Sequence, residues 1–217
     1  MPHPYSAVLF DLDGTIIDSA PGITSSLAHM FETLGRPIPT PSELLAYVGP
    51  PLQQSLVELA GFSEPDSWQA LAVYRERYLA HGAANVTAYE GLTELLHQVK
   101  QAGLPTSLAT SKPESLARLA LTSLGLIDQI DIITGASEDE KRSEKAEIIT
   151  LALQRLEAFG ADVSAPIMIG DRFYDVEGAA ANGIPAIFVE WGYGSPAEQV
   201  GAIAVASTPA EVAALIL

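Results

Sequence analysis

The stretch "VLFDLDGTIID", residues 8–18, decides how the rest of this sequence is interpreted. Its apolar residues, 8–10 and Leu12, predict a buried strand, yet Asp11 and Asp13 stand at the end of that strand. A carboxylate in such a place loses hydration, and a metal ion, a hydrogen-bond donor or a substrate must compensate for the loss. The stretch therefore indicates a strand that ends in a binding site.

Composition narrows the class of protein. The chain has 217 residues, of which 48% are hydrophobic, and this is ample for a packed core. Its formal charge of -16 opposes binding to nucleic acid or anionic lipid and is compatible with a metal cation. Cysteine is absent, which excludes disulfides and fits a reducing compartment. No run resembles a signal peptide or a membrane span, so we expect a cytoplasmic protein.

Short apolar runs alternate with helix-length segments along most of the chain. The expected strands are residues 7–10, 107–109, 130–133, 167–169 and 186–189. Residues 90–102 and 113–124 are expected helices, and Gly103 is placed to end the first of them. This alternation is typical of an α/β fold in which helices cover both faces of a Rossmann-like parallel sheet.

The alternation is interrupted once. Between the first strand and the helix at residue 90 lie about 75 residues with helical periodicity only, far more than a usual connection. We interpret residues 17–84 as an inserted helical cap domain. Residues 1–16 and 85–217 are then the core domain, with hinges expected near residues 15–18 and 85–89.

Polar residues follow three of the expected strands. Besides Asp11, they are Thr110 and Ser111 in "LATSKP" and Asp171 with Asp175 in "GDRFYD". The carboxyl ends of parallel strands meet at one edge of a sheet, so these residues are expected to lie together. Carboxylates suit Mg²⁺, which commonly binds a substrate phosphate at the same time. The hydroxyls, and backbone N–H groups at a helix expected to begin at Pro113, suit a phosphate.

Four motifs together resemble those of the haloacid dehalogenase superfamily. They are "DLDGT" at 11–15, "TSK" at 110–112, a lysine before an amphipathic helix, and "GDRFYD" at 170–175. A helical insert directly after the first motif resembles the phosphoglycolate phosphatase-like branch. The resemblance covers nearly the whole chain and implies an Mg²⁺-dependent phosphatase that hydrolyses a small phosphomonoester.

The resemblance also implies roles for the residues that handle phosphate. Asp11 would be the nucleophile that becomes an aspartyl-phosphate. The side chain of Asp13 would be the general acid and base, and Lys145 would neutralise charge and position Asp11. Thr110 and the backbone of Ser111 would hold the phosphoryl group.

The metal site that the resemblance implies overlaps with these residues. The Asp11 carboxylate, the main-chain carbonyl of Asp13 and Asp171 would bind Mg²⁺, and Asp175 would support them without direct ligation. General physical chemistry agrees, since a cation offsets the repulsion between an anionic nucleophile and an anionic ester.

Several alternatives remain open from the sequence. Arg172 and Tyr174 depart from the usual filling of this motif in phosphoglycolate phosphatases and look more like a 5'-nucleotidase-like group. A phosphomutase uses the same acids, and a non-catalytic module could accept phosphate at Asp11 without releasing it. Dehalogenases are disfavoured because they do not keep a second aspartate, whereas Asp13 is present. The choice between monomer and homodimer is left open.

Three further stretches of the sequence lead to structural predictions. The stretch "EDEKRSEKAEII" holds two lysines, of which Lys145 shares an apolar helical stripe with Ile148 and Ile149, so Lys145 and not Lys141 should face the sheet. "YVGPPLQQS" could line a substrate pocket or simply break a helix. "EWGYGSP" is expected to form a turn beside the site.

Overall fold

The computed structural model describes residues 3–83 and 85–217, and a five-stranded sheet lies at its centre. All neighbouring strands in this sheet run parallel. Their order across the sheet is β4 (Thr106–Leu108), β1 (Ala7–Phe10), β7 (Pro166–Gly170), β8 (Ala186–Val189) and β9 (Ala204–Ala206). The α/β class with a Rossmann-like parallel sheet is therefore confirmed.

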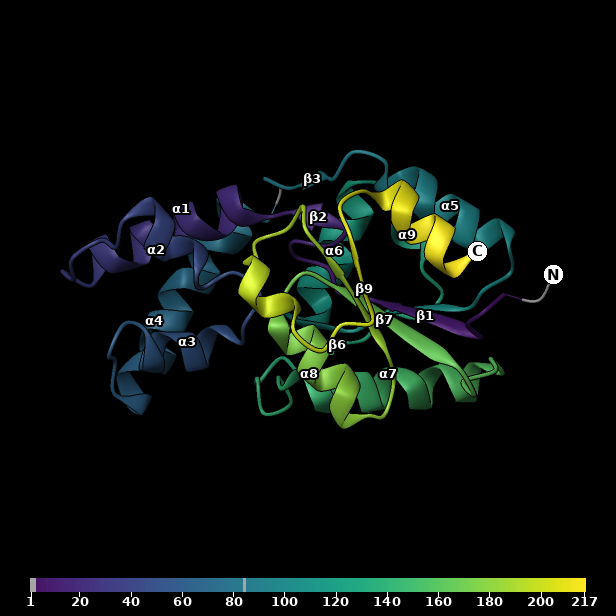
Figure 1. Cartoon of the computed structure of the whole chain (residues 1–217). Coiled ribbons are helices and arrows are strands. Elements are labelled where there is room, and N and C mark those ends of the chain that lie inside the picture. The colour runs from purple at the N-terminus through teal and green to yellow at the C-terminus, as the bar shows by residue number, and fades with distance from the viewer. Residues whose placement is uncertain (1–2, 84) are drawn as a thin grey trace.

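Helices cover both faces of the sheet, and the alternation of side chains along β1 shows why (Figure 1). Val8 and Phe10 belong to an apolar cluster with α5 (Leu92–Gln101), α6 (Glu114–Ser123) and α9 (Pro209–Ile216). Ala7 and Leu9 point to the opposite face, against α7 (Lys145–Phe159) and α8 (Phe173–Ala181). A strand buried on both faces explains the continuous apolar run before Asp11.

The structure corrects some of the expected elements. Residues 130–133 form no strand, although Ile132 makes an isolated bridge to Ser107. They follow a 3-10 turn, Ile127–Gln129, and precede β6 (Gly135–Ala136), which pairs with β5 (Thr110–Pro113). β9 and α9 are not among the elements expected from the sequence.

Pro113 was expected to be the first residue of α6, and it is the extended residue that precedes the helix instead. Gly103 follows Ala102, the residue that caps the end of α5, and has a φ of +73°, as a helix-ending glycine should.

Residues 20–82, called here the helical segment, follow the first motif and extend away from the sheet (Figure 1). They form α1 (Ala20–Thr33), α2 (Pro41–Leu45), α3 (Leu52–Glu58), α4 (Glu64–Arg77) and a π-helical turn, Tyr78–Gly82. These helices share an apolar cluster of their own, which includes Leu27, Met30, Phe31, Leu56 and Tyr74. A separate cluster agrees with a segment that packs largely within itself.

Two short strands join the helical segment to the rest of the chain. β2 (Ile17–Asp18) pairs antiparallel with β3 (Thr87–Ala88). Both lie within the stretches expected to act as hinges, while Ala84, the expected last residue of the insert, lies outside the described residues. The division into a core domain and a cap domain remains a proposal. Among the described residues, no helix has the length and apolar character needed to cross a membrane.

Candidate functional site

The first motif begins where β1 ends. The backbone N–H of Asp11 donates to the carbonyl of Ile169 on β7, so the sheet fixes the position of the aspartate, whose side chain is buried. The chain then turns at Gly14, where φ is +86° and a Cβ atom would overlap the Asp171 carboxylate. Only glycine fits that turn, because it combines a positive φ with the absence of a side chain. The turn thereby brings the first and fourth motifs into contact.

Asp11, Asp171 and Asp175 form a buried cluster of carboxylates at this edge of the sheet. Each offers one oxygen, and these three oxygens lie within 4.8 Å of one another. Lys145 Nζ lies 2.8 Å from Asp11 Oδ1 and 2.8 Å from Asp175 Oδ1, and it donates to the carbonyl of Ala109 at 3.0 Å. The expectation that Lys145 faces the sheet is confirmed, because it is buried at the start of α7 together with Ile148.

Negative charge is in excess in this cluster, and this excess changes the pKa values of its members. Burial raises the pKa of Asp11 to about 6, and the Lys145 ammonium opposes that rise. The pKa of Asp171 is raised well above its usual range by burial and by Asp175 and Asp11. For Lys145, burial acts against the charged form, but Asp11 and Asp175 outweigh it and raise the pKa. Three carboxylates face one ammonium group, and this donor set suits a hard divalent cation.

Asp171 is held from two sides. Thr15 Oγ1 donates to Asp171 Oδ1 at 3.1 Å, and the backbone N–H of Tyr193 donates to Asp171 Oδ2 at 2.8 Å. Tyr193 belongs to "EWGYGSP", so the expectation of a turn beside the site is confirmed. Gly192 in this turn lies against the Asp171 carboxylate, where a Cβ atom would overlap it.

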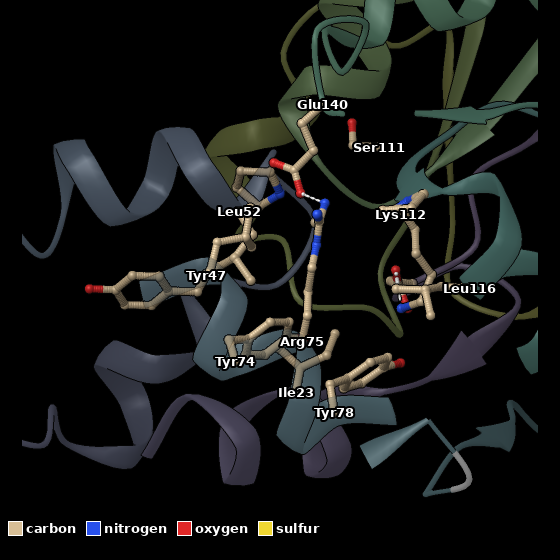
Figure 2. A pocket seen from close by; sticks show the side chains of 15 residues that line it. Ile23, Tyr47, Leu52, Tyr74, Arg75, Tyr78, Ser111, Lys112, Leu116 and Glu140 are labelled. Carbon is tan, nitrogen blue, oxygen red and sulfur yellow. Dashed lines mark hydrogen bonds and ion pairs between the residues drawn. The ribbon is translucent and has the colours of Figure 1, made fainter. Parts of the chain in front are cut away.

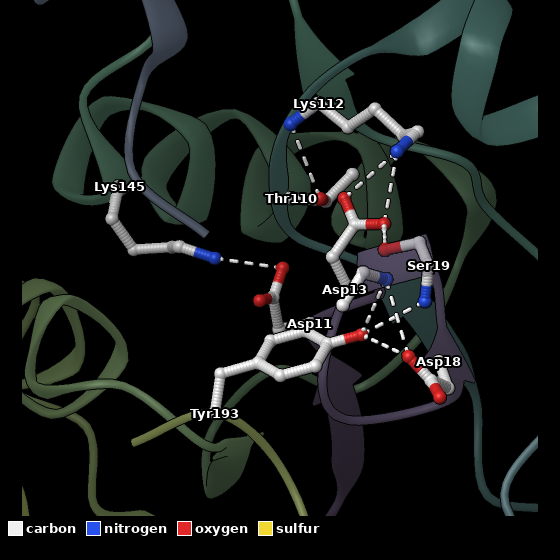
Figure 3. Close-up of polar contacts among 9 residues, drawn as sticks. Asp11, Asp13, Asp18, Ser19, Thr110, Lys112, Lys145 and Tyr193 are labelled. Atoms are coloured by element: carbon white, nitrogen blue, oxygen red, sulfur yellow. Dashed lines mark hydrogen bonds and ion pairs between the residues drawn. The ribbon is translucent and has the colours of Figure 1, made fainter. Parts of the chain in front are cut away.

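Asp13, two residues after Asp11, points toward a second lysine (Figure 3). Lys112 Nζ donates to both carboxylate oxygens, at 2.9 and 3.0 Å, and Ser19 Oγ donates to Oδ1 at 2.5 Å. Burial acts against the charge on Lys112, but Asp13 outweighs it and raises the pKa of the ammonium group. Asp13 is thus separate from the carboxylate cluster and has its own cation.

The residues expected to bind phosphate lie at the same edge. Thr110 is buried, and its hydroxyl accepts a hydrogen bond from the backbone N–H of Lys112 at 3.2 Å. The hydroxyl of Ser111 donates to the carbonyl of Ser143 at 3.1 Å. The Ser111 hydroxyl is therefore already engaged as a donor within the protein.

A cavity of about 60 Å³ lies between this edge and the helical segment (Figure 2). From the core it is lined by Asp13, Ser111, Lys112, Pro113, Leu116 and Glu140, and from the helical segment by Ile23, Tyr47, Gly49, Pro50, Leu52, Leu71, Tyr74, Arg75 and Tyr78. The stretch "YVGPPLQQS" was expected either to line a pocket or simply to break a helix. Four of its residues do line this cavity. Arg75 Nη2 forms an ion pair with Glu140 Oε1 at 2.6 Å across the cavity.

Sequence reasoning brought Asp11, Asp13, Thr110, Ser111, Lys145, Asp171 and Asp175 to one sheet edge, and the structure places all of them there. It missed the contacts of Lys112, Ser19, Tyr193, Arg75 and Glu140. Lys112 is the last residue of the "TSK" motif, and its place in that motif is the one sequence feature that could have indicated a role at the site. The Arg75–Glu140 pair joins residues 65 positions apart and has no local pattern that could reveal it.

The profile of haloacid dehalogenase-like hydrolases matches residues 8–189. The chain belongs to this family. The expected resemblance is confirmed, and the match spans both the sheet edge and the helical segment.

Curated relatives carry different names. A tyrosine-protein kinase, PtkA, from Mycobacterium tuberculosis is 39% identical over 86% of this chain, which spans only 62% of that relative's length. A 5'-nucleotidase from Pseudomonas aeruginosa is 36% identical, with 89% of this chain and 86% of the relative covered. A phosphoglycolate phosphatase from Thiobacillus denitrificans is 31% identical, with 99% and 97% covered.

Among solved structures, one described as a predicted phosphatase from Clostridium acetobutylicum superposes with a TM-score of 0.90. It is 36% identical, and the match covers 97% of each chain. The fold of nearly the whole chain is therefore shared with that protein.

Proposed function

We propose that this chain is an Mg²⁺-dependent phosphatase that hydrolyses a small phosphomonoester through an aspartyl-phosphate on Asp11. The observation that carries the proposal is the cluster of three buried carboxylates around Lys145, with Asp13 two residues from Asp11 but outside the cluster. Phosphoryl transfer needs positioning and charge stabilisation more than covalent chemistry, and this site supplies both.

In the first step, a carboxylate oxygen of Asp11 attacks phosphorus and the bond to the ester oxygen breaks. Lys145 holds Oδ1 of Asp11, and no hydrogen bond or ion pair among the described residues involves Oδ2. Asp13 gives its proton to the departing oxygen, so the alcohol leaves neutral. Thr110 and the backbone of Ser111 are placed to bind the phosphoryl oxygens.

In the second step, water attacks the phosphorus of the aspartyl-phosphate. Asp13, now ionised, takes the proton from that water, and Asp11 and inorganic phosphate are released. The acid step needs a protonated Asp13, whereas the hydrogen bonds from Lys112 and Ser19 suit its ionised form. These contacts support the second role of Asp13, in which its ionised carboxylate acts as the base.

The residues that would hold Mg²⁺ are Asp11, Asp171 and the main-chain carbonyl of Asp13, with Asp175 supporting them through Lys145. The excess of negative charge in a buried site fits such an ion. When bound, the ion would neutralise charge on the transferring phosphoryl group.

The metal requirement gives the main test. Release of inorganic phosphate from p-nitrophenyl phosphate is expected to stop with a chelator and to return with Mg²⁺. Asp171→Asn is expected to raise the Mg²⁺ concentration needed by at least about tenfold, the scale of losing one ligand of the ion. Mg²⁺ should also raise the melting temperature of the wild type, and less so that of the variant. Activity that is indifferent to chelator would contradict the proposal.

The names of the relatives suggest two finer assignments and one different activity. A phosphoglycolate phosphatase, a 5'-nucleotidase and a phosphomutase would all use the same acids, so the residues that receive the leaving group have to distinguish them. A tyrosine kinase would have to admit a protein side chain and a nucleotide, whereas the cavity beside Asp13 measures about 60 Å³. This size favours a small ester in the arrangement seen here. Incubation with labelled ATP and a tyrosine-containing polymer would detect the kinase reaction directly.

A further inference from the structure

Two positively charged side chains line the cavity beside Asp13, and each already forms an ion pair with a carboxylate. Among the described residues that line it, only Asp13, Lys112, Arg75 and Glu140 carry charge. Lys112 pairs with Asp13, and Arg75 pairs with Glu140 (Figure 2). The lining is therefore neutral as a whole, and it offers no unpaired cation to a ligand.

Glu140 is held in this position by several features. It is the one non-glycine residue with a positive φ, +54°, in the part of the chain that the structure describes. Its side chain is only 7% exposed. Besides the ion pair with Arg75, its Oε2 accepts from the backbone N–H of Gln53 at 3.4 Å. An unfavourable backbone conformation therefore accompanies a buried carboxylate that faces the cavity.

This pairing limits which leaving groups the cavity can accept. A leaving group with its own carboxylate would need a cation, and the charge of Arg75 is already balanced by Glu140, so Arg75 could neutralise that carboxylate fully only by releasing Glu140. Glu140 would then be a buried, unpaired carboxylate next to another anion, which is a costly arrangement. An uncharged leaving group requires no such exchange, and the stacked rings of Tyr74 and Tyr78, with centroids 5.5 Å apart, offer it an apolar wall.

We propose that Glu140 is a specificity residue that, by holding Arg75, selects phosphomonoesters with an uncharged leaving group and disfavours those with a second anionic group. The proposal rests on the phosphatase function proposed above. It predicts that 2-phosphoglycolate is a poor substrate and that 2-hydroxyethyl phosphate, similar in size but without the carboxylate, is a better one. Selectivity would come from a repulsive element as much as from an attractive one.

Glu140→Gln tests this directly, because it keeps the shape and removes the charge that occupies Arg75. In the variant, kcat/KM for 2-phosphoglycolate is expected to rise about 10- to 100-fold, the scale of one charge-assisted hydrogen bond, mainly through a lower KM. The value for 2-hydroxyethyl phosphate should stay within about threefold, since a neutral group gains little from a free cation.

Three further variants separate specificity from a structural role. Glu138→Gln removes a charge from the same loop without touching the cavity and should leave the ratio of the two substrates unchanged. Arg75→Gln combined with Glu140→Gln should lose the gain toward 2-phosphoglycolate. Glu140→Gly should reproduce that gain with a residue suited to the positive φ, in case the Gln variant folds poorly.

The outcomes distinguish this proposal from the function on which it rests. A wild type that cleaves p-nitrophenyl phosphate but prefers 2-phosphoglycolate overturns the role of Glu140 alone. So do Gln and Gly variants that change both esters equally, as a merely structural contact between Glu140 and the helical segment would. A wild type that cleaves none of the three esters with Mg²⁺ present overturns both proposals.

Discussion

Two lysine–aspartate pairs lie at the same edge of the sheet and differ in what surrounds them. Lys145 contacts Asp11 and Asp175, and all three belong to the sheet edge and its helices. Lys112 contacts Asp13, but it also lies over the ring of Tyr78 in the helical segment, 5.1 Å from the ring centroid. The first pair is fixed by the core alone, whereas the second depends on where the helical segment sits.

This difference separates two parts of the proposed reaction. Attack on phosphorus would use groups held by the sheet and its helices, which do not depend on the helical segment for their position. Proton transfer would use Asp13, which accepts a hydrogen bond from Ser19 just before α1. Its ion-pair partner, Lys112, contacts the ring of Tyr78. Closing the segment over a substrate would therefore alter the acid and base more than the nucleophile.

The largest expected effect is on the core side of the comparison. Asp11→Asn should lower kcat by on the order of 10⁴-fold or more, because an amide can neither attack phosphorus nor offer a negative charge. The fold should persist, since the amide is nearly isosteric. Asp128→Asn, at an exposed aspartate whose carboxylate makes no hydrogen bond or ion pair among the described residues, is the control and should retain wild-type kcat in the same assay. Full activity of Asp11→Asn would exclude the nucleophilic role.

The next prediction concerns Lys145, the first residue of α7, and Lys141, which precedes the helix. Lys145→Ala should lower kcat by about 10²- to 10³-fold, as loss of a preorganised charge at a reacting centre does. Lys141→Ala should have little effect, because its side chain is 85% exposed and, among the residues that the structure describes, forms an ion pair only with Asp139. Steady-state kinetics of the two variants decides the matter, and the reverse ranking would refute the role of Lys145.

Lys145→Ala also leaves buried Asp11 and Asp175 without a cation, which should cost about 3–5 kcal/mol of stability. Lys145→Met keeps more of the buried side chain, and urea denaturation of both variants shows how far lost activity reflects unfolding.

These examples show what a sequence can and cannot reveal. Lys145 could be placed because helical periodicity determines which face of α7 meets the sheet. The 130–133 strand was a wrong prediction, because its buried Ile130 and Ile133 pack in an apolar cluster without forming a ladder. The partners of Lys112 and Arg75 depend on how the helical segment lies against the core. No local pattern encodes that placement, so these contacts became visible only in three dimensions.

A smaller effect is expected on the other side of the comparison. Leu52 lines the cavity from the helical segment, and Leu52→Ala should enlarge the space for the leaving group. The ratio of kcat/KM between a bulky and a small ester should change by up to about tenfold, while p-nitrophenyl phosphate changes less. Leu45→Ala, at an exposed leucine of the same segment, is the matched control. A Leu52 variant that slows every ester equally would argue against specificity in this segment.

The smallest expected effect tests whether the two parts separate, because Tyr193 contacts both. Its backbone N–H donates to Asp171. Its hydroxyl donates to Asp18 Oδ1 at 2.8 Å and accepts from the N–H groups of Ser19 and Ala20 at 2.8 and 3.0 Å. Tyr193→Phe removes only the second set of contacts, which join the core to the beginning of the helical segment.

Loss of that hydroxyl should cost about 1–2 kcal/mol, as expected when partly buried donors lose an acceptor, and should lower the melting temperature by a few degrees. The value of kcat should fall only about two- to fivefold, because Ser19, and through it Asp13, is less well positioned. The Mg²⁺ concentration for half-maximal activity should stay the same, since the contact with Asp171 is made by the backbone. Tyr5→Phe, whose hydroxyl makes no hydrogen bond among the described residues, controls for the loss of a phenol. If Tyr193→Phe instead raised the Mg²⁺ requirement as Asp171→Asn should, the metal site and the start of the helical segment would be one coupled unit, and the distinction between the two lysine pairs would fail.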